Sequence, residues 1–157
     1  MGEIRLMATV EKRLMDRHAD LLVHQKGAKE FTPEQRSVLE AMDRWIEAVT
    51  GGDPEKVASL YAPDAVFWGT VSPFLRTTPE GVADYFRHFL RLPHLNAIYF
   101  KPMVRVYGDI ALNTGYYTFF YEEEGTFKQI PARYTFVYRK DESGEWKIIE
   151  HHSSAVP

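Results

Sequence analysis

The stretch PARYTFVYRKDESGEWKIIEHHSS, residues 131–154, holds two runs of β-branched and aromatic residues separated by a polar segment around Ser143-Gly144. This pattern predicts a β-hairpin. Because side chains alternate between the two faces of a strand, Arg133, Thr135 and Val137 share one face and the intervening aromatic residues take the other. Arg133 requires an explanation, since the other residues of its strand are mainly aromatic or β-branched.

The remaining segments place helices before strands. Apolar spacing and capping signals such as Thr32-Pro33-Glu34-Gln35 predict helices over residues 4–24, 32–50, 54–61 and 79–90. Runs of β-forming residues predict strands over 65–68, 95–107, 110–121, 127–139 and 146–154. This order is typical of an α+β domain, with helices packed on a strongly curved mixed or antiparallel sheet that encloses a cavity. We expect an N-terminal helical arm over 1–31 and one cone-like domain over 32–157.

Composition limits the class of protein. The 157 residues are 45% hydrophobic, include no cysteine and carry a formal net charge of -3. This size and apolar content predict one soluble domain with a sizeable core, and the lack of cysteine fits a reducing compartment, so we expect the cytoplasm. No window approaches the roughly 20 apolar residues of a membrane span, and the basic residues are scattered. Neither a membrane nor a nucleic acid is an expected partner.

Two stretches resemble a known family. Leu60 to Phe67, LYAPDAVF, follows two predicted helices, and Trp146 to Ser154, WKIIEHHSS, ends the last hairpin. Together with the run of strands they are similar to the nuclear transport factor 2-like superfamily, which includes ketosteroid isomerases and SnoaL-like polyketide cyclases. The closing strand most resembles the association domain of calcium/calmodulin-dependent protein kinase II. The resemblance covers about residues 32–157.

The resemblance implies a cone-like α+β fold with a deep cavity, dimers formed through the outer face of the sheet and, in the kinase hubs, rings of dimers. The hub cavity is lined by arginines and a histidine. The matching positions here are Tyr117, Thr135, Ser153 and Tyr85, none of them basic. A smaller or more neutral ligand is therefore favoured over an acidic one. The chain has no Gly-rich phosphate loop, no HRD and no DFG motif, so we expect an association domain that stands alone.

Arg133 has two interpretations. It either pairs with an acid such as Glu150, or lies in the cavity and holds an anionic ligand group through its guanidinium. Two registers of the last hairpin fit the pattern, and Arg133 faces His152 in one and His151 in the other. In both, one histidine lies beside Arg133 and the other points away. Because the two histidines cannot easily bind one ion together, we predict no metal, and we expect no cofactor.

Catalysis on a carbonyl compound would require a general base held near its substrate. The candidates are Asp64, before the first strand, and Glu150 and His152 on the closing strand. Asp64 fits a turn-capping role better, and Glu150 also fits an ion pair. The predicted ligand-binding residues are Arg133, His152, His151, Tyr117, Tyr85, Thr135 and Trp68.

The aromatic residues on the other face of the strands must also be shielded from water. We expect this set on the outside of the sheet, where an apolar patch of such size indicates an interface: Phe119, Tyr121, Tyr134, Phe136 and Tyr138. The first hypothesis is therefore a homo-oligomerisation module, a homodimer or a ring of dimers, with a small-molecule-binding cavity. The second is an isomerase, cyclase or dehydratase with a cavity histidine or carboxylate as general base. The sequence leaves both open.

Overall fold

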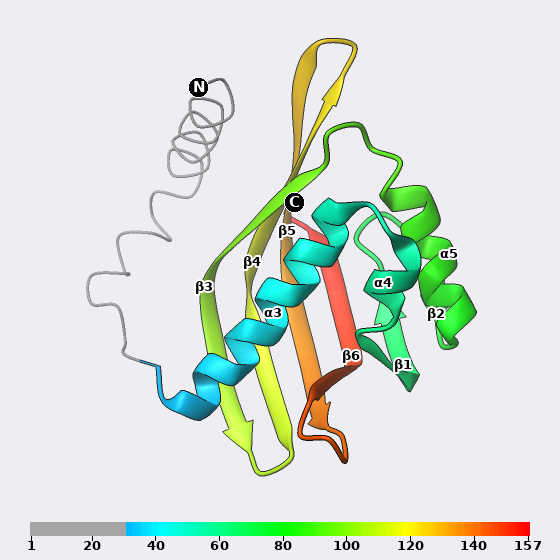
Figure 1. Cartoon of the computed structure of the whole chain (residues 1–157). Coiled ribbons are helices and arrows are strands. Elements are labelled where there is room, and N and C mark those ends of the chain that lie inside the picture. Colours follow the sequence, from blue (N-terminus) through cyan, green and yellow to red (C-terminus); the bar gives the residue numbers. More distant parts are fainter. Residues whose placement is uncertain (1–30) are drawn as a thin grey trace. The chain divides into compact units, whose positions relative to one another are not determined.

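A computed structural model describes residues 31–157, and the predicted helical arm over 1–31 lies outside this range except for Phe31. The described helices are α3 Pro33–Gly51, α4 Pro54–Ala58 and α5 Pro79–Phe89 (Figure 1). The strands are β1 Tyr61–Trp68, β2 Leu75–Arg76, β3 Asn96–Tyr107, β4 Ile110–Glu123, β5 Thr126–Lys140 and β6 Trp146–Ala155.

The strands form one open sheet in the order β2-β1-β6-β5-β4-β3. β1 runs parallel to β6, whereas every other neighbouring pair in this sheet is antiparallel. The predicted α+β fold with a mixed sheet is therefore confirmed. Among the helices of residues 31–157, none is long and apolar enough to cross a membrane.

Helix α3 begins at the predicted capping box. Thr32 Oγ1 accepts a hydrogen bond from the Gln35 amide at 3.2 Å, and Gln35 Oε1 accepts one from the Thr32 amide at 2.9 Å, which satisfies two otherwise free backbone donors. Its apolar side, with Met42 and Trp45, is buried. Figure 1 shows α3 lying across one face of the sheet. We call this face the inner face and the opposite one the outer face.

Strand β3 bends where its pairing with β4 is interrupted between Phe100 and Met103. Lys101 adopts a left-handed φ of 57° at this bulge. Gly115 faces the bend, because a Cβ atom there would lie 2.7 Å from the Tyr134 hydroxyl oxygen and 3.2 Å from the Lys101 carbonyl oxygen. A bulge bends the strand that contains it. The bend therefore depends on residues of both strands, Lys101 in β3 and Gly115 in β4.

The aromatic residues of β5 point to the inner face, so our prediction that they cover the outside is wrong. Tyr134, Phe136 and Tyr138 are at most 2% exposed, and Phe119 of β4 is 1% exposed. Burying rings under α3 removes far more apolar surface from water than burying Arg133 would. Tyr121, the fifth residue of the predicted outer patch, is half-buried.

The register of the last hairpin also differs from both predicted registers. Lys140 pairs with Trp146, and a bulge at Ile149 then shifts the pairing, so that Arg133 lies opposite Ser154 and neither histidine. The Asp141 carboxylate stabilises the turn by accepting hydrogen bonds from the amides of Ser143 and Glu145, each at 2.9 Å. A bulge is not encoded in simple alternation, which is why the sequence did not predict the shift.

Two helix and strand limits are corrected as well. Helix α4 ends at Ala58, and Tyr61, which we assigned to that helix, is the first residue of β1. The two-residue edge strand β2 was not predicted. Starting β1 earlier places the Tyr61 ring in the core, where it is 6% exposed.

Gly69, which follows β1, provides a test of this packing. A Cβ atom at Gly69 would overlap the buried ring of Tyr85, whereas one at Gly51 would have nothing within 4 Å. We expect Gly69→Ala to lower the free energy of unfolding by about 1–3 kcal/mol, measured by urea denaturation. Gly51→Ala at the end of α3 is the matched control and should be neutral or stabilising by up to about 1 kcal/mol. Equal effects of the two substitutions would contradict the close approach at Gly69.

Candidate functional site

The imidazole of His151 lies on the inner face of β6 and is 1% exposed. It stacks on Phe136 of β5 with ring centroids 3.9 Å apart and on Phe67 of β1 at 4.8 Å. Both phenylalanines are its direct neighbours across the strands. The indole of Trp45, from α3, meets the imidazole edge-on at 5.5 Å. His151 therefore joins three strands and a helix.

Both ring nitrogens of His151 have hydrogen-bond partners. The Tyr61 hydroxyl lies 2.8 Å from Nδ1, and the Tyr117 hydroxyl lies 3.1 Å from Nε2. Trp45 Nε1 donates to the Tyr61 oxygen at 3.0 Å. Because an indole only donates, the Tyr61 proton is assigned to the bond with Nδ1, and the imidazole then carries its proton on Nε2 and donates to Tyr117.

The chain of hydrogen bonds continues to the segment after β1. The Tyr117 hydroxyl donates to Ser153 Oγ, which is also hydrogen-bonded to Thr70 Oγ1. Thr70 also lies near enough to the Tyr85 hydroxyl of α5 to lower its pKa. We call these residues the inner network: Trp45, Tyr61, His151, Tyr117, Ser153, Thr70 and Tyr85.

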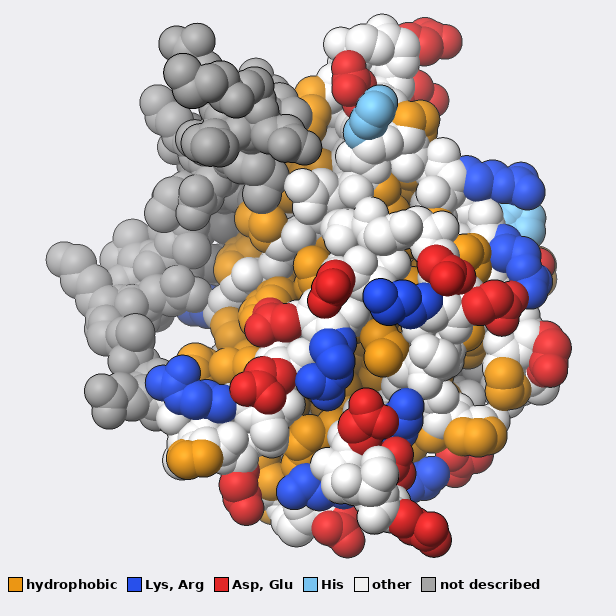
Figure 2. All heavy atoms as spheres, viewed as in Figure 1, with side chains coloured by type: hydrophobic (Ala, Val, Ile, Leu, Met, Phe, Trp, Pro, Cys, Tyr) orange, Lys and Arg blue, Asp and Glu red, His pale blue; other side chains and the backbone are white. Residues whose placement is uncertain are grey.

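The inner network is uncharged. Burial, with a smaller effect from the charge on His152, holds the pKa of His151 well below its usual value. Burial also raises the pKa of the Tyr85 hydroxyl to about 12 and the pKa values of Tyr61 and Tyr117. Figure 2 shows where charges gather instead: acidic and basic side chains are interspersed over the surface on the helix side. Neutral hydroxyl, indole and imidazole groups suit the binding of a polar, uncharged group.

The predicted ligand-binding residues separate into two groups. His151, Tyr117 and Tyr85 meet in the inner network. Arg133, Thr135, His152 and Trp68 lie on the outer face, where His152 is opposite Thr135 on one side and Trp68 on the other. Arg133 is exposed, and its Nε donates to Ser154 Oγ at 3.2 Å. The seven residues therefore do not form one site, and their roles in binding stay predictions.

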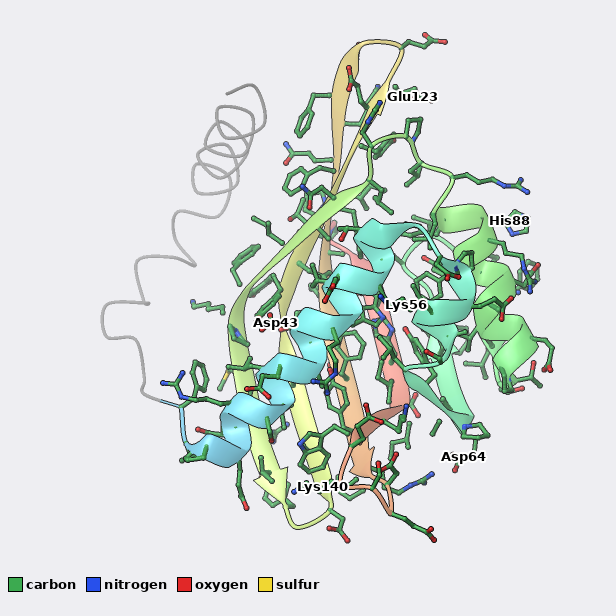
Figure 3. All side chains as sticks on the ribbon, viewed as in Figure 1. Asp43, Lys56, Asp64, His88, Glu123 and Lys140 are labelled. Carbon is green, nitrogen blue, oxygen red and sulfur yellow. The ribbon has the colours of Figure 1, made fainter. Side chains whose placement is uncertain are left out.

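The three catalytic candidates also lie apart from His151. Asp64 is exposed, as Figure 3 shows at the rim of the molecule, and accepts hydrogen bonds of 3.0 and 3.3 Å from the Arg139 guanidinium. Those hydrogen bonds lower the pKa of the Asp64 carboxyl. Glu150 lies on the outer face opposite Val137, and His152 is exposed there. Within residues 31–157, no group of three or more His, Asp or Glu side chains is placed to hold a metal ion.

Several polar residues of the inner side were missing from the predicted ligand-binding set, among them Tyr61, Thr70 and Asn113. Tyr61 was assigned to a helix, and Thr70 lies in a segment without periodicity, so neither carried a usable signal. Asn113 did carry one. It alternates with Ala111, Gly115, Tyr117 and Phe119 in β4, and a lone amide in such a series indicates a buried polar group.

The buried imidazole predicts how stability depends on pH. Since the pKa of His151 is lowered in the folded state, the unfolded chain binds the proton first as the pH falls below about 6.5. The contribution of the neutral His151 imidazole to the free energy of unfolding is thus complete above about pH 6.5. It is lost as the pH falls below that value, by up to about 1.4 kcal/mol per pH unit. We expect urea denaturation between pH 7.5 and 5.5 to show this loss.

Substitutions of the two adjacent histidines test whether His151 causes this loss of stability at low pH. His151→Gln, which cannot titrate, should unfold with nearly the same free energy at pH 7.5 and 5.5, although it starts less stable. His152→Gln, at the exposed neighbouring position, should keep the slope of the wild type. A wild-type stability that stays flat from pH 7.5 to 5.5 would show that His151 is not held neutral by burial.

Comparison with known proteins agrees with this geometry. The sequence model of the calcium/calmodulin dependent protein kinase II association domain matches residues 34–157. A candidate association domain of this kind from Xanthomonas campestris is 41% identical, with a TM-score of 0.76 and coverage of 84% of this chain and 94% of its own.

More distant structures share the fold alone. A candidate dehydratase of the NTF2-like family from Streptomyces avermitilis is 22% identical (TM-score 0.70, covering 80% of this chain and 99% of that one). A ketosteroid isomerase-like protein from Erwinia carotovora atroseptica is 17% identical (TM-score 0.68, 81% and 99%). No curated protein sequence matches significantly. On the match over residues 34–157, the chain belongs to the calcium/calmodulin dependent protein kinase II association domain family.

Proposed function

We propose that the chain is a homo-oligomerisation module that assembles through the outer face of its sheet and binds a small molecule on the inner side. A homodimer is the basic unit of this proposal, and a ring of dimers is its larger form. Membership of the association-domain family supports assembly in general. The exposed apolar side chain of Met103 on the outer face is the observation that carries the proposal for this chain.

Met103 lies on β3, an edge strand of the sheet, and its outer-face side chain is 63% exposed. The neighbouring outer-face side chains of Leu112 and Val137, which pair with each other across β4 and β5, are half-buried. Arg105 and Glu150 flank Leu112 and Val137 in that row, which continues to the half-buried Val66 of β1. Apolar side chains with charged residues among and around them are common in protein interfaces.

The inner network supports the binding of a small molecule, because it gathers polar side chains from four strand positions, two helices and the segment after β1 on the inner side, where apolar packing alone would not require them. The same geometry gives little support to the isomerase, cyclase or dehydratase alternative. Both nitrogens of His151 are occupied, and its lowered pKa makes it a weak base. The carboxylates of Asp64 and Glu150 lie elsewhere on the fold. We therefore advance binding rather than catalysis.

Assembly is tested by the mass in solution. Light scattering after size exclusion at about 20 µM should give a multiple of the 18.2 kDa chain mass. Met103→Glu should shift that mass toward the monomer, since a charge buried without a partner costs about 2 kcal/mol or more, which weakens the dimer at least about thirtyfold.

Phe74→Glu is the matched control. Phe74 is 67% exposed, but it lies between β1 and β2, at the opposite edge of the sheet from β3. It should leave the mass unchanged. A monomeric wild type at this concentration, or equal effects of the two substitutions, would rule out assembly through the outer face.

A further inference from the structure

The side chain of Asn113 lies within the inner face of the sheet and is 0% exposed. It stands in a row with Val104 of β3, Phe136 of β5 and, beyond Phe136, His151. Its Oδ1 accepts a hydrogen bond from the Tyr134 hydroxyl at 3.0 Å, which orients the amide. Its Nδ2 has no hydrogen-bond partner among the described residues. One oriented donor is therefore left over.

The Tyr138 hydroxyl is a second buried group of this kind. Tyr138 is 1% exposed, lies on the inner face one row from Asn113, and its hydroxyl has no partner within the described part of the chain. The two unpartnered groups thus belong to the same region under α3.

Leaving both groups unpaired is costly, because each has given up its hydrogen bonds to water without gaining a partner. Phenylalanine at position 138 would remove one cost without changing the shape of the core. Two other buried atoms without partners, Arg76 Nε and Thr118 Oγ1, lie away from this region, at the edge strand β2 and on the outer face. Within residues 31–157, only Asn113 and Tyr138 place such groups in adjacent inner-face rows beneath α3.

The surroundings define the chemical class that would satisfy them. Asn113 Nδ2 is a donor, and a tyrosine hydroxyl can donate or accept, so the complementary atom is an acceptor oxygen. The arginines of β5, Arg133 and Arg139, are exposed. Arg44 of α3 acts electrostatically on Tyr138 but is itself exposed. Burying an anion here without a buried cation would cost more than it returns.

We propose that Asn113 and Tyr138 are the polar anchor of a binding site for an uncharged small molecule that presents a carbonyl or hydroxyl oxygen. This inference rests on the proposed binding of a small molecule on the inner side, and it defines the position and the ligand class. It also predicts that carboxylates are rejected.

Two pairs of probes with nearly the same shape test the class: acetamide against acetate, and benzamide against benzoate. The side-chain amide signals of Asn113 in the ¹⁵N spectrum of the full chain, identified by their loss in Asn113→Leu, report contact directly. We expect a saturable shift with at least one amide and at least tenfold weaker binding of its carboxylate. Tyr138→Phe should weaken amide binding about tenfold, as expected for one lost hydrogen bond.

Tyr107→Phe, at a position that is 62% exposed, is the control and should bind like the wild type. Tyr138→Phe removes a single unpartnered oxygen and should fold, and the comparison of amide with carboxylate needs no variant. Signals that ignore both amides, or respond equally to the carboxylates, overturn the inference. So does a long-lived water contact at Asn113 without any amide response, which would mark a buried water only.

The oligomeric mass of the same samples separates this inference from the proposed assembly. Loss of amide binding in a protein that still assembles would remove the inner site alone. Amide binding by a monomer would remove the assembly and leave the inner site.

Discussion

The imidazole of His151 is held between the rings of Phe67 and Phe136, and this stack of three rings crosses β1, β6 and β5. Two hydroxyls and the indole of Trp45 then determine how the imidazole is oriented. A protonated imidazole would lose an acceptor nitrogen and place a charge among phenylalanines. Packing of the sheet against α3 therefore depends on His151 staying neutral.

That requirement explains the distribution of charge over the two faces. With an imidazole kept neutral by burial, the hydrogen-bond partners beside it are themselves neutral: hydroxyls and an indole. The arginines of β5, Arg133 and Arg139, are at the surface, where their charges stay hydrated. The resemblance to the kinase hubs marked the positions of Tyr117, Ser153 and Tyr85 for basic residues in a cavity. In this chain those three positions carry the hydroxyls of the inner network.

The sequence was sufficient for features that depend on local chemistry. The capping box at Thr32 and the alternation within each strand are local, and they predicted α3 and the separation of His151 from His152 correctly. Which face of β5 lies inside depends on α3, far away in the chain. We followed Arg133 and placed its face in the cavity, although burying the aromatic face removes more apolar surface from water.

The candidate site was harder to predict than the fold because it depends on register. The bulge at Ile149 moves Arg133 two positions away from His152, and the early start of β1 brings Tyr61 to His151. Neither event has a reliable signal in one sequence. Tyr117, Ser153 and Tyr85 came from the family resemblance, and their position on the inner side did not depend on that register.

The two faces of the sheet make separable demands on the sequence. Because neighbours in a strand point to opposite faces, Thr135 can vary with the outer face while Tyr134 and Phe136 keep the inner one. Assembly and ligand binding can therefore change independently in one domain, except where a bulge links them. Ile149 is such a place, because it is the extra, unpaired residue of the bulge. Its position decides which side chains of β6 point to the inner face with His151 and which point to the outer face with Arg133. If Ile149 paired regularly with Val137 in place of Glu150, the rest of β6 would turn over and exchange His151 with His152, so this bulge secures the interior and the outer face at once.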